Sequence, residues 1–423
     1  MIIGPGLIGT SVGLALRERG VRVWLADGDP RAAGLAASLG AGELLPAGPP
    51  VPAPDSGGVP ASGPGSGGVP ASGPGSGGVP AFAPPPGGPA DLAVLAVPPD
   101  AVAPVLATAQ AAGLAACYTD VASVKARPLA AARALGCDLA RYVPGHPLAG
   151  RERSGPAAAR ADLFLGRPWA LCPAAETAPH AVACVTGLVT ACGAEPVTAA
   201  ADEHDRWVAL VSHAPHVVAS AMAARLASAP DGALALAGQG LRDVTRIAAG
   251  DTALWTQILL ANAAGVSEVL ALIADDLHQA AVALADAGPA TEAPADPAVP
   301  GAAPPAGPPG GAEKAGPRLA ALLDSGGAGV ARIPGKHAGP ATRYAIVQVV
   351  IPDQPGELAR LFQAAGEAGV NIEDFGIEHS PGLPSGVAEL AVSPNAAAPL
   401  AAALSARGWP AYTAPPPATA PPS

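Results

Sequence analysis

The chain has 423 residues, and glycine (53) and proline (52) together make up about a quarter of it, which requires linkers or disordered insertions. Only 3% of residues are aromatic and the net charge is −11, which argues against a nucleic-acid partner. The five cysteines form no C-x-x-C pair, and each apolar run of about 18 residues contains a charge, a histidine or a proline. We therefore expect a cytoplasmic protein without a membrane-spanning helix.

The first 45 residues predict the opening of a doubly wound α/β sheet. An apolar stub at 1–3 precedes a glycine-rich helix start, a strand at 21–26 and a helix that begins at Pro30 after the N-cap Asp29. From about 46 to 89 the ten-residue unit SGGVPASGPG repeats. Such a repeat has little apolar surface to bury, so we expect a disordered surface insertion.

The α/β pattern resumes at residue 90. The segments DLAVLAVPP and CYTDVASVK are typical of buried strands, and each is followed by a helical segment. We assign 1–155 to a Rossmann dinucleotide-binding domain and 156–287 to an all-helical domain. The last long helix of this second domain, 251–287, has few charges on any face, which favours packing against another subunit in a homodimer.

The C-terminal third predicts a small separate module. Residues 288–341 are expected to be a Pro/Ala/Gly linker with a short helix at 318–324. Strands at 344–351, 370–377 and 386–392 and helices at 357–368 and 396–407 then give a ferredoxin-like β-α-β-β-α order within 342–413. We expect residues 414–423 to be disordered.

A dinucleotide motif lies at the start of the first helix, where Gly4, Gly6 and Gly9 form G-x-G-x-x-G. In this context Gly4 permits a tight turn, Gly6 lets a pyrophosphate approach the backbone, and Gly9 lets helix and strand pack closely. Asp27 ends the next strand and is expected to bind the adenosine ribose of NAD, although Arg31 leaves NADP open. The other expected cofactor contacts are Leu7, Ile8, Val97 and Pro98.

Polar residues concentrate in the segments TDVASVK, PGHPLAGRERSG, EHDRWVALVSHAPH and DVTRIAAGDTALW. In this order, and with GPGLIGTS and DLAVLAVPP, they resemble the prephenate dehydrogenase family of tyrosine biosynthesis, including its arogenate-using relatives. The resemblance covers roughly residues 1–285. It implies a Rossmann domain, a helical dimerisation domain and NAD-dependent oxidative decarboxylation of a cyclohexadienyl acid.

The resemblance also implies roles for single residues. Hydride loss leaves positive character on the hydroxyl-bearing ring carbon, so a neutral His146 would accept a hydrogen bond from that hydroxyl, with Ser123 orienting it or touching the same hydroxyl. Arg246 would bind a substrate carboxylate, because arginine offers bidentate geometry. The further substrate-site candidates are His213, His216 and Glu152, the last in an ionic gate with Arg242 and Asp243.

Some of these polar residues have a simpler interpretation. His204 in EHD is expected to be a hydrogen-bonding residue at a helix start, and Lys125 fits either a surface or a site charge. His213 and His216 lie on one helical face, but no H-E-x-x-H motif and no third ligand accompany them, so we expect no metal. Pro215 between them is expected to kink or begin the helix.

The segment 344–362 together with Val370-Asn371-Ile372 resembles the ACT regulatory domain. That resemblance implies a small ligand near Gly356 and Asn371, with tyrosine as the expected effector; a ligand-free oligomerisation module is the alternative. For the enzyme, arogenate is the alternative substrate. A non-catalytic amino-acid or NAD sensor is a second alternative, and a β-hydroxyacid dehydrogenase is a third, although the helical lysine expected of it is not apparent.

Overall fold

The structure is a computed structural model that describes residues 1–46, 83–150, 155–287, 311–333, 344–379 and 384–413. Most of the predicted insertion, the tail 414–423 and the site candidate Glu152 therefore lie outside the described residues. The chain divides into two compact units, Met1–Ile273 and Ala274–Ser423, which are treated separately below.

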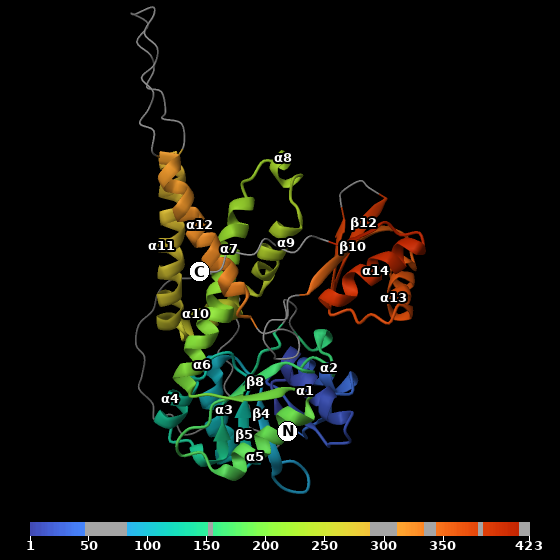
Figure 1. Cartoon of the computed structure of the whole chain (residues 1–423). Helices are drawn as coiled ribbons and strands as arrows, with labels where there is room; N and C mark the ends of the chain where they lie inside the picture. The colour runs from blue at the N-terminus through green and yellow to red at the C-terminus, as the bar shows by residue number, and fades with distance from the viewer. Residues whose placement is uncertain (47–82, 151–154, 288–310, 334–343, 380–383, 414–423) are drawn as a thin grey trace, which may run out of the picture. The chain divides into compact units, whose positions relative to one another are not determined.

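The first unit is built on a six-stranded parallel sheet with the order β3-β2-β1-β4-β5-β6 (Figure 1). The central strand β1 is only two residues long, and its Ile2 lies between Leu25 of β2 and Val94 of β4. This order is that of a doubly wound nucleotide-binding sheet, as the sequence predicts. The strands are β1 Ile2–Ile3, β2 Trp24–Ala26, β3 Glu43–Leu44, β4 Ala90–Leu95, β5 Ala115–Asp120 and β6 Tyr142–Val143.

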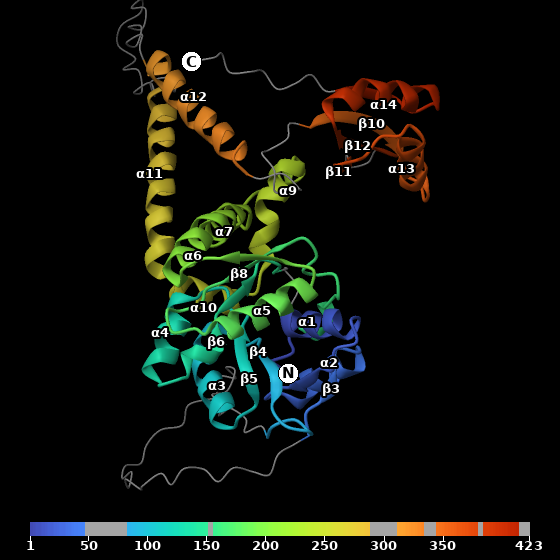
Figure 2. The ribbon, with the colours of Figure 1, turned by 60° about the horizontal axis from the view of Figure 1, so that its bottom comes forward.

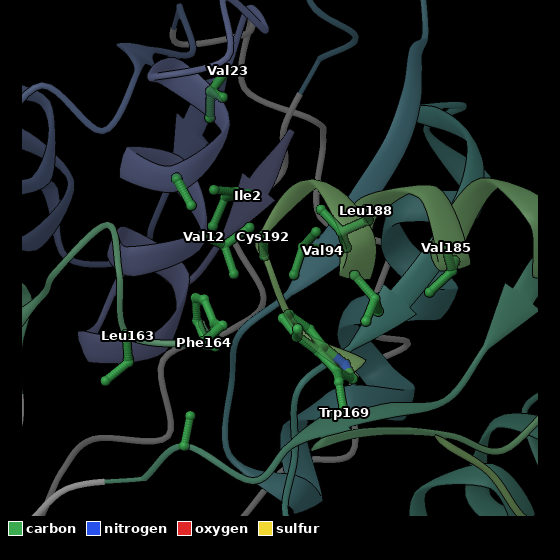
Figure 3. Packing of buried hydrophobic residues seen from close by; sticks show 14 of the residues in the cluster. Ile2, Val12, Val23, Val94, Leu163, Phe164, Trp169, Val185, Leu188 and Cys192 are labelled. Atoms are coloured by element: carbon green, nitrogen blue, oxygen red, sulfur yellow. The ribbon is translucent and has the colours of Figure 1, made fainter. Parts of the chain in front are cut away.

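Helices cover both faces of this sheet (Figure 2). On one face a core that includes Val12, Phe164 and Trp169 packs against the sheet, and the two aromatic rings lie 5.1 Å apart (Figure 3). This core receives α1 Leu7–Arg17, α2 Pro30–Ser38 and α5 Pro179–Ala191. The opposite core receives α3 Pro99–Ala111 and α4 Ala126–Ala134.

A second, three-stranded sheet extends the α/β part beyond residue 155. It has the order β7-β8-β9, with β7 Gly145–Pro147, β8 Pro168–Leu171 and β9 Glu195–Thr198. The prediction of helices alone after residue 156 is therefore wrong up to residue 198. Strands of four residues beside proline and glycine are too short to show a periodic pattern. His146 lies in β7, so it belongs to a strand and not to a loop.

The helical part begins with one long helix made of three pieces. Helix α6 (Ala201–Val208) runs through a π-helical turn (Ala209–His213) into α7 (Ala214–Leu226). Pro215 has no N–H to donate, and it lies in the first turn of α7 just after the widened turn, so the expectation that it kinks or begins the helix is confirmed. The remaining pieces are α8 Asp231–Leu234, α9 Gln239–Arg246, η4 Ile247–Ala249, α10 Thr252–Ala261 and α11 Ala263–Ala287.

By length and mean hydropathy, the helix Ala201–Leu226 could cross a membrane, and so could α10 with α11, which are bent by 96°. This differs from the expectation of no such helix. The buried polar residues of Ala201–Leu226 are His204, Asp205, His213 and His216, a set that would be costly in lipid.

The second unit contains the helix α12 (Gly311–Val330) and a four-stranded antiparallel sheet of order β11-β12-β10-β13. The β-α-β-β-α-β sequence confirms the ferredoxin-like prediction and adds one strand. The elements are β10 Ala345–Pro352, α13 Glu357–Glu367, β11 Asp374–His379, β12 Ser385–Val392, α14 Pro394–Ala406 and β13 Ala411–Thr413. Helix α12 is longer than the predicted 318–324, because its alanines and leucines outweigh the glycines and Pro317.

Candidate active site

The glycine loop between β1 and α1 has the geometry of a dinucleotide cradle. Gly4 has φ +87°, and a Cβ there would lie 2.6 Å from the carbonyl oxygen of Ala96. A Cβ at Gly9 would lie 2.7 Å from the carbonyl oxygen of Gly4, so this helix packs closely on the loop. Gly6 caps α1 and faces open space, with no atom within 4 Å of its Cβ position. A phosphate can therefore approach the N–H groups of the first helical turn.

The other expected cofactor residues lie at the same edge of the sheet. Leu7 and Ile8 form the first turn of α1, while Val97 and Pro98 directly follow the neighbouring strand β4. Asp27 directly follows β2, and its Oδ1 accepts a hydrogen bond from Asp29 N at 2.8 Å. Partial burial raises the pKa of the Asp27 carboxyl, although the backbone hydrogen bonds that it accepts act to lower that pKa. The carboxyl ends of β1, β2 and β4 meet here, where such sheets bind their ligands.

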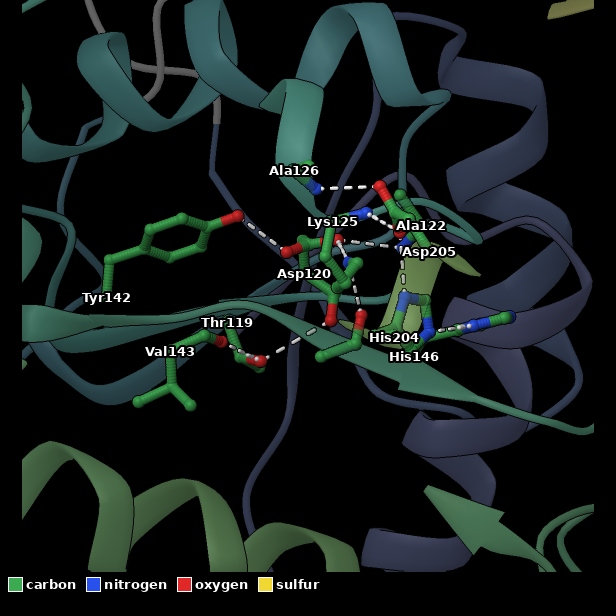
Figure 4. Close-up of polar contacts among 11 residues, drawn as sticks. Thr119, Asp120, Ala122, Lys125, Ala126, Tyr142, Val143, His146, His204 and Asp205 are labelled. Atoms are coloured by element: carbon green, nitrogen blue, oxygen red, sulfur yellow. Dashed lines mark hydrogen bonds and ion pairs between the residues drawn. The ribbon is translucent and has the colours of Figure 1, made fainter. Parts of the chain in front are cut away.

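His146 lies at one end of a buried hydrogen-bonded chain (Figure 4). Its side chain is only 9% exposed, and its Nδ1 lies 2.9 Å from Nε2 of His204. Nδ1 of His204 in turn lies 2.8 Å from Oδ1 of Asp205. Burial, followed by the nearby charges of His204, Lys125 and His213, holds the pKa of His146 well below its usual value. His146 is therefore neutral near pH 7.

Asp205 joins this chain to the sheet domain. Its Oδ1 accepts from Lys125 N at 2.8 Å and its Oδ2 from Ala126 N at 2.9 Å, so it caps the N-terminus of α4 from another helix. Burial alone would raise the pKa of Asp205, but the hydrogen bonds from His204 and from these two N–H groups lower it overall. Asp205 is therefore a carboxylate and can only accept hydrogen bonds.

A buried ion pair supports the backbone beside His146. Lys125 and Asp120 are both fully buried and paired, and the Lys125 ammonium also donates to the carbonyl of Gly145 at 2.6 Å. Tyr142 donates its hydroxyl to Asp120 Oδ2 at 2.5 Å, and burial followed by Asp120 raises the pKa of that hydroxyl. Lys125 is thus an internal charge and not a surface one.

The two histidines of SHAPH have different surroundings. His213 is buried, its Nδ1 lies 3.1 Å from Nδ2 of Asn262, and burial lowers its pKa to about 4. His216 stacks on Trp255 with ring centroids 3.6 Å apart and planes 11° apart, and burial lowers its pKa as well. Trp255 also meets His213 edge-on at 6.1 Å. These rings form one aromatic group between α7 and α10.

Of the predicted site residues, the structure brings His146 and His213 near each other, since His213 is one of the charges that, after burial, lower the pKa of His146. Ser123 lies in the loop after β5, two residues before Lys125, but within the described part of the chain its side chain joins none of these hydrogen bonds. Arg246 ends α9, and α9 packs against α7, the helix that carries His216.

The sequence analysis gave His204 only a hydrogen-bonding role at a helix start, and it missed Asp205 and Asn262. One signal was available in the sequence: His204 and Asp205 lie four residues before Val208 and Ala209, and so share an apolar face of the helix with them. A charged pair on the apolar side of an amphipathic helix indicates a buried polar partner. The identity of that partner, 58 residues away in the sequence, carries no local signal.

Comparison with known proteins agrees with this geometry. Residues 88–198 match the model of the prephenate dehydrogenase nucleotide-binding domain, and residues 200–289 that of the prephenate dehydrogenase dimerization domain. The boundary between them lies after β9, later than the 155/156 division expected from the sequence.

Relatives extend the match over almost the whole chain. The chain is 38% identical over 413 residues to the probable prephenate dehydrogenase NovF of Streptomyces niveus, covering 97% of this chain and 98% of that protein. It is 34% identical over 204 residues to the cyclohexadienyl dehydrogenase of Zymomonas mobilis, covering 46% of this chain and 68% of that protein.

Among solved structures, the prephenate dehydrogenase of A. aeolicus in complex with hydroxyphenyl propionate and NAD+ shares the fold, with a TM-score of 0.52 and 23% identity. The match covers 67% of this chain and 89% of that one. Given the near-complete match to the Streptomyces protein, the chain belongs to the prephenate dehydrogenase family.

Proposed function

We propose that the protein catalyses the NAD-dependent oxidative decarboxylation of prephenate to 4-hydroxyphenylpyruvate in tyrosine biosynthesis. The observation that carries this proposal is the neutral, buried His146, held through its Nδ1 by a histidine–aspartate pair. The same chain also contains a glycine loop with dinucleotide geometry and a part that matches the prephenate dehydrogenase dimerization domain.

The cofactor fits the glycine loop. Gly6 leaves the N-terminus of α1 open to a pyrophosphate, and Asp27 ends the strand where an adenosine ribose would lie. The negative charge of Asp27 would repel a 2′-phosphate, which favours NAD over NADP. When bound there, NAD supplies the hydride acceptor.

His146 assists the loss of hydride from the substrate. As hydride leaves the hydroxyl-bearing carbon, the hydroxyl becomes more acidic, and a neutral imidazole stabilises it by accepting its hydrogen bond. The carboxylate on the opposite ring carbon departs as carbon dioxide, its bonding electrons complete the aromatic ring, and the oxygen ends as a phenol. The low pKa of His146 keeps it in the accepting state near neutral pH.

The substrate anions need fixed cations or donors in a pocket. Arg246 is proposed to bind one carboxylate, assisted by His213 or His216, because a guanidinium gives two parallel hydrogen bonds. Ser123 is proposed to contact His146 or the same hydroxyl once substrate is bound. Glu152 is proposed to close the mouth of the site together with Arg242 and Asp243.

Arogenate remains the alternative substrate. It carries an amine where prephenate carries a keto group, and the ring chemistry assigned to His146 is the same for both. The similarity to a cyclohexadienyl dehydrogenase, a name that does not separate the two acids, favours keeping this alternative.

The ferredoxin-like module is proposed to be an ACT domain that binds tyrosine between paired modules. Asn371 lines a cavity of about 410 Å³ with Phe362 and Phe375. Gly356, in a left-handed turn with φ +93°, lies between Gln354 and Glu357, which line another cavity of about 520 Å³. In a dimer of such modules, these two cavities could together form a binding site for the effector. We propose a cytoplasmic homodimer, which the match to a dimerization domain supports.

The direct test is to follow absorbance at the NADH band with prephenate and with arogenate, each with and without tyrosine. The proposal predicts turnover of prephenate with NAD, a lower kcat/KM with arogenate, and inhibition by tyrosine. Turnover of neither acid would refute the activity. Titration calorimetry of the intact chain and of Gly356→Asp with tyrosine and phenylalanine would test the effector separately.

A further inference from the structure

With both histidines neutral, the chain from Asp205 through His204 to His146 has only one arrangement of protons that satisfies all its members. Asp205 is a carboxylate and donates no hydrogen bond, so the proton between it and His204 must sit on Nδ1 of His204 (2.8 Å). A neutral imidazole carries one proton, so Nε2 of His204 is then a lone pair.

The same reasoning fixes the position of the proton on His146. Nε2 of His204 lies 2.9 Å from Nδ1 of His146, and two lone pairs at that distance would repel. His146 must therefore carry its proton on Nδ1 and donate it to His204. Its Nε2 is left as the acceptor nitrogen.

We propose that His204, held by Asp205, is a positioning residue that fixes the tautomer and the ring plane of His146, so that Nε2 of His146 faces the reaction as a hydrogen-bond acceptor. This inference rests on the proposed function. The rings of the two histidines meet edge-on, with centroids 5.1 Å apart and an interplanar angle of 76°, which is the geometry of an in-plane N–H of one ring reaching the other (Figure 4).

The Asp205 end of this chain is anchored. Asp205 is fixed by Lys125 N and Ala126 N at the start of α4, and Asn262 donates to its backbone carbonyl at 2.7 Å. His204 is 2% exposed, so water cannot easily replace it as a partner of His146. A buried donor without its acceptor would pay its full desolvation penalty, which is why loss of His204 should release His146 to the other tautomer.

The pair also helps His146 at the moment of reaction. As the substrate hydroxyl gains acidity, positive charge grows on His146, and its Nδ1–H bond to His204 strengthens. The negative charge of Asp205 lies one ring further on and stabilises that change without itself taking up a proton.

The test compares His204→Gln with His204→Leu. A glutamine amide can donate to Asp205 and accept from His146, so we expect kcat within about 10-fold of the native value. Leucine can do neither, so kcat should fall by about 10²-fold or more with the KM for NAD unchanged. His180→Leu, at an exposed histidine of α5, is the matched control. If leucine prevents folding, His204→Asn, too short to reach both partners, replaces it with the same expectation.

A second measurement does not depend on activity. In protein labelled with ¹⁵N-histidine, with His146→Asn used to assign the signal, His146 should be the Nδ1–H tautomer in the native chain and in His204→Gln. In His204→Leu that tautomer should be lost. An unchanged kcat in His204→Leu, or an Nε2–H proton on His146 in the native protein, would overturn the inference. If the native protein turned over neither acid, the proposed function would fail, and the tautomer measurement would still decide the inference.

Discussion

The glycine loop at the start of α1 and the histidine chain behind β7 belong to the same compact unit, but they are built in opposite ways. In the loop, the backbone of neighbouring residues makes the site, and a missing side chain is what matters at Gly6. In the histidine chain, side chains from β7 and α6 make the site together with two backbone N–H groups at the start of α4. The first kind of site is encoded by local spacing, whereas the second depends on the tertiary fold.

Replacing His146 should distinguish the histidine chain from the glycine loop most sharply. His146→Asn is expected to lower kcat by a factor on the order of 10² or more while NAD binding stays intact, because the amide cannot act as the same acceptor. Steady-state kinetics and a fluorescence titration with NAD would measure this, with His180→Asn as control. Near-native turnover would remove His146 from the mechanism.

Acid should destabilise the histidine region before it affects the glycine loop. The folded pKa of His213 is about 4, below the ordinary value near 6.5, so the unfolded chain takes up its proton first as the pH falls. Folding stability is therefore full above about pH 6.5 and declines toward pH 4, by about 3 kcal/mol for this group as an order of magnitude. His146, shifted in the same direction, adds to the decline.

Urea unfolding at pH 7 and at pH 5 would measure this decline. His213→Asn should reduce the difference between the two pH values, whereas His180→Asn should leave it unchanged. Equal stability of the native chain at both pH values would contradict the assignment of buried neutral histidines.

Two glycine substitutions separate folding from binding within the loop. A Cβ at Gly9 would lie 2.7 Å from a backbone oxygen, so Gly9→Ala should lower the free energy of unfolding by about 2 kcal/mol. A Cβ at Gly6 meets no protein atom, so Gly6→Ala should fold normally and bind NAD more weakly. Melting temperature and NAD affinity measure the two effects, and an equal loss of stability in both variants would contradict these roles.

The smallest expected effect is at Asp27. Asp27→Asn removes the charge that should accept from the ribose hydroxyls, so the KM for NAD should rise by about 10-fold. The preference for NAD over NADP should fall at the same time, because the repulsion of a 2′-phosphate is lost. Kinetics with both cofactors would measure this, and an unchanged preference would show that another residue selects the cofactor.

The contrast between the glycine loop and the histidine chain also explains which parts of the structure could be predicted from the sequence. The spacing of Gly4, Gly6 and Gly9 before a helix predicts the turn, the open approach and the close packing that the structure has. The alternation of apolar segments predicts the ferredoxin-like module, apart from the short strand β13. Helical periodicity also predicts the helices after residue 200.

The remainder depends on contacts between distant residues. Lys125 and Asp205 are 80 residues apart. No local pattern reveals that the Asp205 carboxylate caps the helix that begins after Lys125. His204 has the local appearance of a helix-start residue, and only the fold places it between Asp205 and His146. The small sheet β7-β8-β9 was missed because each strand is short and its register is set by tertiary packing.

The central claim is that Nε2 of His146 accepts the hydrogen bond of a substrate ring hydroxyl. The most direct test is a crystal structure of this protein with NAD and a 4-hydroxyphenyl propionate bound in place of product. We predict that the ring oxygen lies within hydrogen-bond distance of Nε2 of His146, with Nδ1 still on His204. A ring oxygen bound elsewhere, with His146 turned away from it, would contradict the account.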